Sequence, residues 1–176
     1  MRPWTSGRPV MAWIVGAAVL APLLAMATVS ERDLRMKERL VELSQSAEPL
    51  DDLRMEMLDG NMAASRHYEI VHGRVVSRVW DSPGVPGKHE ERRVRDAEVR
   101  ALLRALIEKQ YWMFQGTRFI PDNTMFLFRI YYKDWPPVDY RCDVEEYIAS
   151  PQRAAIRAIL LDFVAGTLPA TPTASH

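Results

Sequence analysis

The sequence predicts an α+β fold, an antiparallel sheet of about four to five strands with two helices on one face, in the order hairpin, helix, hairpin, helix. Three observations predict this fold. Residues 96–108 carry apolar side chains at helical spacing, residues 124–132 are almost all apolar, and residues 138–144 alternate between apolar and charged side chains. A sheet with one buried face that helices cover accounts for all three patterns.

The N-terminal segment predicts a membrane or signal helix in front of the domain. Residues 10–29 contain no charged residue and follow two arginines. The basic start and the small residues Ala25 and Ala27 fit a cleaved signal peptide over residues 1–29. The length favours a transmembrane anchor, since about 20 apolar residues span the hydrocarbon core of a bilayer.

Both interpretations predict that the chain enters the secretory route. We therefore expect a membrane-anchored protein that faces the extracytoplasmic side, or an exported, periplasmic protein after signal cleavage. Membrane contact is predicted through residues 10–29. The orientation stays open, because lysine and arginine residues lie on both sides of this segment.

Residues 30–52 predict a charged juxtamembrane helix followed by a linker. A serine can cap the helix, and a modest apolar stripe runs from Leu34 to Leu43 among many charges. Such a helix suits a stalk or an element that lies on the domain. The globular domain is then expected over residues 53–166.

Three strands are expected at the start of the domain. Residues 53–59 alternate between apolar and charged side chains, and residues 65–71 and 74–80 flank the turn signal His72-Gly73. Residues 81–88 contain prolines and glycines and predict an irregular loop. The basic and acidic residues that follow are typical of a solvated surface.

The first domain helix is predicted to begin at Asp96, whose carboxylate can accept a hydrogen bond from a first-turn amide. Its apolar side chains recur at helical spacing on one face. These residues are Val99, Leu102, Leu103, Leu106 and Ile107. Arginines spaced four apart occupy the opposite face, so the helix is expected to pack on the sheet through its apolar stripe.

The second hairpin is predicted to join residues 124–132 to residues 138–144. Two prolines must lie in the turn, because proline cannot donate to a strand ladder. Charge complementarity predicts a register in which Arg129 faces Asp143 and Lys133 faces Asp139. Alternation also places Cys142 in the core, with its side chain buried.

The last helix is predicted to begin after Ser150-Pro151 and to end at Gly166. Serine caps the first turn, proline is favoured at the first helical position, and glycine suits the left-handed C-cap. Residues 167–176 are rich in proline, threonine and alanine and are predicted to be a disordered tail.

Composition and motifs exclude several functional classes. The formal net charge is zero and the pI is about 6.9, so no nucleic-acid partner is expected. The single cysteine rules out an intrachain disulfide. The sequence contains no phosphate-binding loop, nucleophile elbow, zinc-protease or dinucleotide signature. We therefore predict no cofactor and no catalytic residues.

Three histidines are the remaining candidates for metal chemistry. His67, His72 and His89 are expected in or beside loops near one sheet edge, next to acidic residues. Imidazole and carboxylate groups can hold a divalent metal ion. Their spacing matches no established ligand pattern, so they are weak candidates.

Aromatic residues on the second hairpin suggest a contact surface. Tyr131, Trp135 and Tyr140 are the predicted interaction residues, because tyrosine and tryptophan anchor many protein interfaces. The same side chains also serve as core filler, and Trp135 at the hairpin tip is the one expected to be exposed.

The sequence thus predicts an envelope protein whose small, non-enzymatic α+β domain binds a protein partner. One alternative is a small metal-dependent hydrolase that uses His67, His72 and His89. Another alternative is a structural subunit of a membrane complex. The identity of the partner stays open, as does the oligomeric state.

Overall fold

The computed structural model describes residues 30–61, 64–80, 87–113 and 125–168. The predicted membrane or signal helix at residues 10–29 and most of the predicted tail lie outside these residues. The elements, in chain order, are α1 (Glu31–Gln45), β1 (Leu53–Gly60), β2 (Ser65–Val71), β3 (Arg74–Trp80), β4 (His89–Arg93), α2 (Asp96–Glu108), the short 3₁₀ helix η2 (Tyr111–Met113), β5 (Met125–Tyr132), β6 (Val138–Asp143), α3 (Val144–Ala149) and α4 (Pro151–Ala165).

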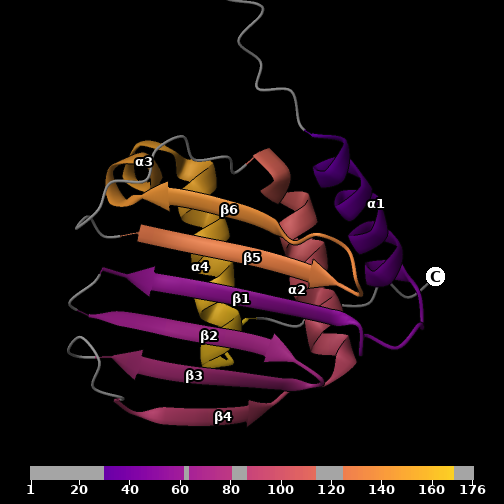
Figure 1. The fold of residues 1–176 in the computed structure, drawn as a ribbon, viewed down its shortest axis with the longest axis horizontal. Coiled ribbons are helices and arrows are strands. Elements are labelled where there is room, and N and C mark those ends of the chain that lie inside the picture. Colours follow the sequence, from indigo (N-terminus) through magenta and orange to yellow (C-terminus); the bar gives the residue numbers. More distant parts are fainter. Residues whose placement is uncertain (1–29, 62–63, 81–86, 114–124, 169–176) are drawn as a thin grey trace, which may run out of the picture.

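The strands form one antiparallel sheet in the order β4-β3-β2-β1-β5-β6. Helices α2 and α4 lie behind the sheet in Figure 1, and α1 packs beside α2 on the same side. The α+β class and the antiparallel sheet are therefore confirmed, whereas the prediction of two packed helices was too low, because α1 packs against α2 as well. The described sheet has six strands, and the prediction of four to five was too low.

The additional strand is β4, which the sequence analysis assigned to a solvated surface. Its sequence is His-Glu-Glu-Arg-Arg, and nearly all of its side chains are exposed. Such a strand has no hydrophobic alternation to detect, because main-chain pairing with β3 holds it at the edge of the sheet. Charged edge strands also discourage pairing with another chain.

The core lies between the sheet and the helices. On β5 the even-numbered side chains are buried, with exposed fractions of 0–3%, and the odd-numbered ones are half-buried. The buried apolar side chains of β6 are Val138, Tyr140 and Cys142, and Asp143 at the end of the strand is buried as well. Burial of Cys142, and the face on which it lies, are therefore confirmed. The apolar stripe of α2 is confirmed too, although its Ile107 is only partly buried.

Helix α1 is part of this core. Met36, Leu40 and Leu43 are 0–1% exposed, whereas Leu34 is 42% exposed, so the predicted stripe was wrong at its first residue. Two arginines of α2 bind the carbonyl oxygens at the end of α1: Arg100 donates to Leu43, and Arg104 donates to Ser44. Those carbonyls have no partner within the helix, so the arginines join the two helices.

The register of the second hairpin was predicted incorrectly. Arg129 faces Asp139, and Met125 faces Asp143. The turn is tight, because the Trp135 amide donates to the Tyr132 carbonyl at 3.0 Å and Lys133 takes a positive φ of 50°. The prolines follow this turn, so the partner strand begins at Val138 and every charged pair shifts. The predicted faces survive, because both registers place the same side chains on the same face.

The predicted helix and turn signals hold with one small shift. Ser150 accepts from the Arg153 amide at 3.4 Å, and Gly166 takes the left-handed conformation at φ 77°. His72 and Gly73 both have positive φ, as a tight hairpin turn requires. Helix α2 is capped by Arg95 rather than Asp96, and the Glu98 carboxylate accepts from the Arg95 amide at 3.0 Å.

Candidate functional site

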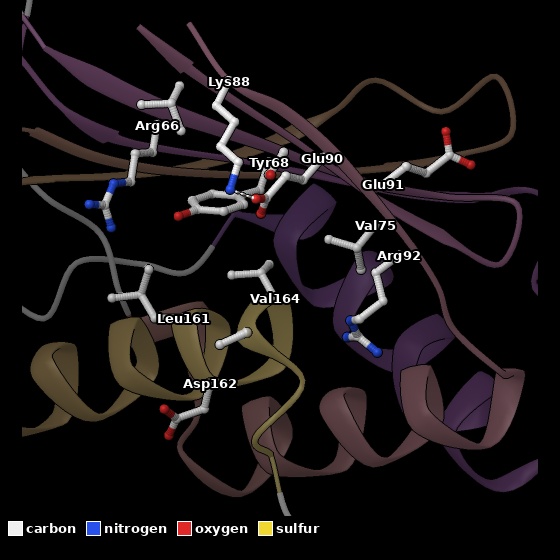
Figure 2. Close-up of a pocket in the computed structure, with 13 residues that line it drawn as sticks. Arg66, Tyr68, Val75, Lys88, Glu90, Glu91, Arg92, Leu161, Asp162 and Val164 are labelled. Carbon is white, nitrogen blue, oxygen red and sulfur yellow. Dashed lines mark ion pairs between the residues drawn. The ribbon is translucent and has the colours of Figure 1, made fainter. Parts of the chain in front are cut away.

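A groove lies between the outer half of the sheet and the end of α4 (Figure 2). It holds about 820 Å³. Its lining residues, which we call the groove residues, are Arg66, Tyr68, Val75, Ser77, Val79, Lys88, Glu90, Glu91, Arg92, Leu161, Asp162, Val164 and Ala165. The groove exists because the helices do not cover the inner side of β4.

Strand register explains which side chains enter the groove. Tyr68 pairs with Ser77, and Ser77 pairs with Glu90, so these three side chains form one row across β2, β3 and β4. Side chains directly opposite each other in a sheet share a face. The inner face therefore changes from apolar on β2 and β3 to charged on β4, where no helix buries it.

The floor of the groove is apolar. Val75 is 2% exposed, and Tyr68 is partly buried against the core. Leu161 and Val164 face them from α4, on the opposite wall in Figure 2, and are also partly buried. These two side chains lie beside the buried stripe of α4 rather than in it, so they present apolar surface to the groove.

Arg92 closes one side of the groove and has a structural role. Its Nη2 donates to the Phe163 carbonyl at 2.6 Å, and its Nη1 lies 3.3 Å from Glu98. Its guanidinium also lies 5.5 Å from the centre of the Phe163 ring. Phe163 is in the last turn of α4, where carbonyls lack helical partners and cations are favoured. Arg92 therefore fastens β4 to the end of α4.

Arg66 has a different environment. It projects from β2 beside the hydroxyl of Tyr68, above Leu161 (Figure 2). Within the described part of the chain, Arg66 forms neither a hydrogen bond nor an ion pair. Lys88, on the same wall, is already paired with Glu90. The groove therefore offers one uncommitted guanidinium beside an apolar floor.

This arrangement can bind a group that carries both a carboxylate and an apolar part. A guanidinium next to a phenol hydroxyl can hold a carboxylate through charge-assisted hydrogen bonds, and the apolar floor can take an aliphatic or aromatic group. The groove residues include no histidine, cysteine or threonine. Their one serine, Ser77, lies opposite Glu90, whose carboxylate is paired with Lys88.

The predicted metal residues do not come together. His67 and His89 both pair with Arg78, so a cationic strand position separates them across two strand spacings of about 5 Å each. His72 lies at the far end of the β2–β3 hairpin. Burial lowers the pKa of His67, with Arg78 adding to the effect. Among the described residues, no group of three metal-ligating side chains is found.

The predicted interaction residues occupy three separate environments. Tyr140 is 1% exposed and packs against Tyr111, with ring centroids 5.3 Å apart, so a partner cannot reach it. Burial raises the pKa of both tyrosines. Trp135 is partly buried against Tyr132, and Arg35 of α1 stacks over it at 4.1 Å. The three aromatics therefore do not form one surface.

Tyr131 lies on the opposite face of the sheet, inside a network of charges. Its hydroxyl donates to Glu56 at 2.8 Å. Nearby, Arg129 donates to both oxygens of Asp139, at 2.5 and 2.8 Å. These hydrogen bonds from Arg129, with a smaller contribution from Arg141, lower the pKa of Asp139 to about 2. The network satisfies its own charges, which leaves little for a ligand to gain there.

None of the groove residues was predicted as a site residue from the sequence. Arg66 and Tyr68 fall within the strand predicted over residues 65–71. A signal was present on α4, where Leu161 and Val164 widen the apolar stripe beyond what the core needs. The open inner side of β4 could not be predicted, because the strand itself was not predicted.

Comparison with protein-family models finds no match to this chain, and a search of curated protein sequences finds none either. Among the described residues, no helix is long and apolar enough to cross a membrane, and residues 10–29 are not among them. The site must therefore be interpreted from its own geometry.

Proposed function

We propose that this chain is an envelope protein whose α+β domain binds a protein partner and does not catalyse a reaction. Residues 10–29 act as its membrane anchor or signal peptide, on the strength of their length and lack of charge. The partner is bound in the groove beside α4. The observation that carries this proposal is the uncommitted Arg66 next to an apolar floor.

The size and lining of the groove support this role. Ligand sites are concave, mostly apolar, and carry a few placed polar groups, with volumes of roughly 300–1,000 Å³. The groove has about 820 Å³, which is within that range, and its lining combines aliphatic side chains on the floor with charged side chains on the walls. A peptide segment that places one apolar side chain over Leu161 and one carboxylate on Arg66 would satisfy both parts of the site.

The chemistry of Arg66 fixes the kind of segment. Guanidinium groups bind carboxylates through two parallel hydrogen bonds, which adds geometric selection to charge attraction. We therefore expect a segment in which an aspartate, a glutamate or a free C-terminus lies close to an aliphatic or aromatic residue. A basic side chain is disfavoured at the position of the carboxylate, because it would face Arg66.

A peptide-display selection against the full-length chain tests the proposal. We expect the recovered peptides to share an acidic residue next to a large apolar residue. Replacing Arg66 with glutamate should weaken their binding by at least about tenfold, because a carboxylate then faces a carboxylate. Arg93→Glu is the matched control, since Arg93 is an exposed arginine on the outer face of neighbouring β4.

Two outcomes would contradict the proposal. Peptides that bind Arg66→Glu and the wild-type chain equally well would remove the groove as the site. Peptides whose binding is lost on replacing Tyr131 or Trp135, and not Arg66, would return the site to the hairpin aromatics of the sequence analysis.

A further inference from the structure

The described residues expose only two large hydrophobic side chains, and both lie at one end of the fold. Leu34 is 42% exposed and Ile148 is 70% exposed. Leu34 lies at the beginning of α1, and Ile148 lies in α3. Figure 1 draws the start of α1 and all of α3 along the upper edge of the molecule, with α1 on the right and α3 on the left, and β4 along the lower edge.

The chain before α1 joins the fold at this same end. Ser30 caps α1, with its hydroxyl accepting from the Asp33 amide at 3.1 Å. The uncharged stretch of residues 10–29 ends directly before Ser30, so no spacer separates the two. A helix rises 1.5 Å per residue, so Leu34 lies about 7 Å along α1 from the end of that stretch.

One aromatic and one charged side chain lie close to Leu34. Lys37, one turn further along α1, lies 4.2 Å over the ring of Trp112, which is partly buried. Tryptophan beside lysine or arginine is common at the level of lipid headgroups. The exposed charges on these two helices are of both signs: Glu31 and Arg32 lie on α1, and Glu145 lies on α3. Apolar contact is therefore a stronger attraction here than net charge.

We propose that the domain rests on a lipid surface through the end formed by α1 and α3, with Leu34 and Ile148 entering the headgroup region. This inference rests on the proposed function, in which residues 10–29 lie in a bilayer. It goes further by giving the folded domain its own membrane contact. Because the contact is apolar, it does not require anionic lipid. The groove then faces away from the surface, since β4 lies at the other end.

Depth-dependent fluorescence quenching tests this inference on the full-length chain in phosphatidylcholine vesicles. Single cysteines at Leu34, Ile148 and Arg93 carry an environment-sensitive dye, and brominated phosphatidylcholine is the quencher. Native Cys142 is 1% exposed and stays unlabelled in the folded protein. We expect quenching at Leu34→Cys and Ile148→Cys to exceed that at Arg93→Cys by at least about twofold, as groups in the headgroup region would show.

A further labelled variant controls for effects that the dye itself has at Leu34 and Ile148. A label at Glu145→Cys, on exposed α3, should be quenched in the wild-type background and released in the double variant Leu34→Asp and Ile148→Asp. Circular dichroism checks that the double variant is folded. Adding phosphatidylglycerol should change the quenching by less than about twofold, because the contact is apolar.

Three results would overturn the inference. The first is equal quenching at all three dye positions in vesicle-bound protein. The second is quenching that appears only with phosphatidylglycerol, which would mean an electrostatic contact. The third is a chain that does not sediment with the vesicles. Binding of the selected peptides to the vesicle-bound protein is measured separately, so loss of the lipid contact and loss of the proposed partner site can be distinguished.

Discussion

The two ends of the sheet differ in how their inner faces are covered. On β5 and β6 the inner side chains are aromatic and aliphatic, and those of Phe126, Phe128 and Tyr140 are 0–1% exposed beneath the helices. On β4 the inner side chains are Glu90 and Arg92, and together with Lys88, the residue before the strand, they border an open groove. One continuous strand ladder therefore carries a closed core at one edge and the proposed binding groove at the other.

This difference teaches that sheet and helix layers need not match in width. In the described chain the buried inner face runs from β6 to Val75 of β3, and the inner side chains change from apolar to charged on β4, where the helical cover ends. Burial of apolar area stabilises a sheet only where a second layer excludes water. Outside that cover, main-chain pairing holds the strands, and the side chains are free to serve a ligand.

The largest expected effect on the free energy of unfolding is in the buried core beneath β5 and β6. Phe128→Ala should lower the free energy of unfolding by about 3–5 kcal/mol, because it leaves a cavity in a fully buried site. Leu161→Ala in the groove removes a similar apolar group from a partly covered position, so its cost should stay below about 2 kcal/mol. Urea unfolding of both variants measures the difference, and equal costs would contradict the comparison.

A smaller effect is expected at the fastening between β4 and α4. Arg92→Met should lower the free energy of unfolding by about 1–3 kcal/mol, since the Phe163 carbonyl loses a charged donor. Arg93→Met is the matched control and should change it by less than about 0.5 kcal/mol. If the two variants unfold at the same urea concentration, Arg92 does not fasten the edge strand.

An ion pair on the outer face of the sheet should make the stability of the protein depend on pH in acid. Asp139 has a pKa of about 2 in the folded protein because Arg129 donates to it, and about 3.9 when unfolded. A lowered folded pKa stabilises the protein above the unfolded value, and this contribution is lost as the pH falls from about 4 to about 2. Asp139→Asn should cost about 1–2 kcal/mol at neutral pH and flatten that acid dependence.

Glu90→Gln is the control for the acid experiment. Its partner Lys88 is largely exposed, and exposed pairs contribute about 0–1 kcal/mol. Stability measured from pH 7 to pH 2 should therefore follow the wild-type curve. An Asp139→Asn curve that also follows the wild type would show that the pair with Arg129 does not stabilise the fold.

The smallest stability effect is expected at Arg66, where the largest effect on binding is expected. Arg66→Glu should change the free energy of unfolding by less than about 0.5 kcal/mol, because Arg66 makes no ion pair or hydrogen bond in the described part of the chain. Urea unfolding checks this. A decrease of about 2 kcal/mol or more in the free energy of unfolding would show that Arg66 stabilises the fold and is not available to bind a ligand.

The parts of the fold that follow from local patterns were predicted well. Helix α2 has a clean apolar stripe, the Ser150-Pro151 and Gly166 signals bound α4, and alternation placed Cys142 in the core. Each of these depends on residues close together in sequence. Periodicity and capping chemistry determine them directly.

Features that depend on distant contacts were predicted poorly. Strand β4 has no apolar residue, and only its pairing with β3 makes it a strand. The hairpin register was chosen by charge, but the turn at Tyr132–Trp135 decides it. Leu34 resembles a core residue, yet the position of α1 against α2 buries Met36 instead. The groove forms only when several such long-range contacts are in place, so its residues could not be identified from the sequence.

Amide hydrogen exchange of the full-length chain, with and without a selected peptide, tests the central claim most directly. If the groove is the binding site, protection should rise in β3, in β4 and in the second half of α4, and stay unchanged in β5 and β6. The opposite pattern, with new protection at residues 131–135 and none in β4, would contradict the claim and assign binding to the closed side of the sheet.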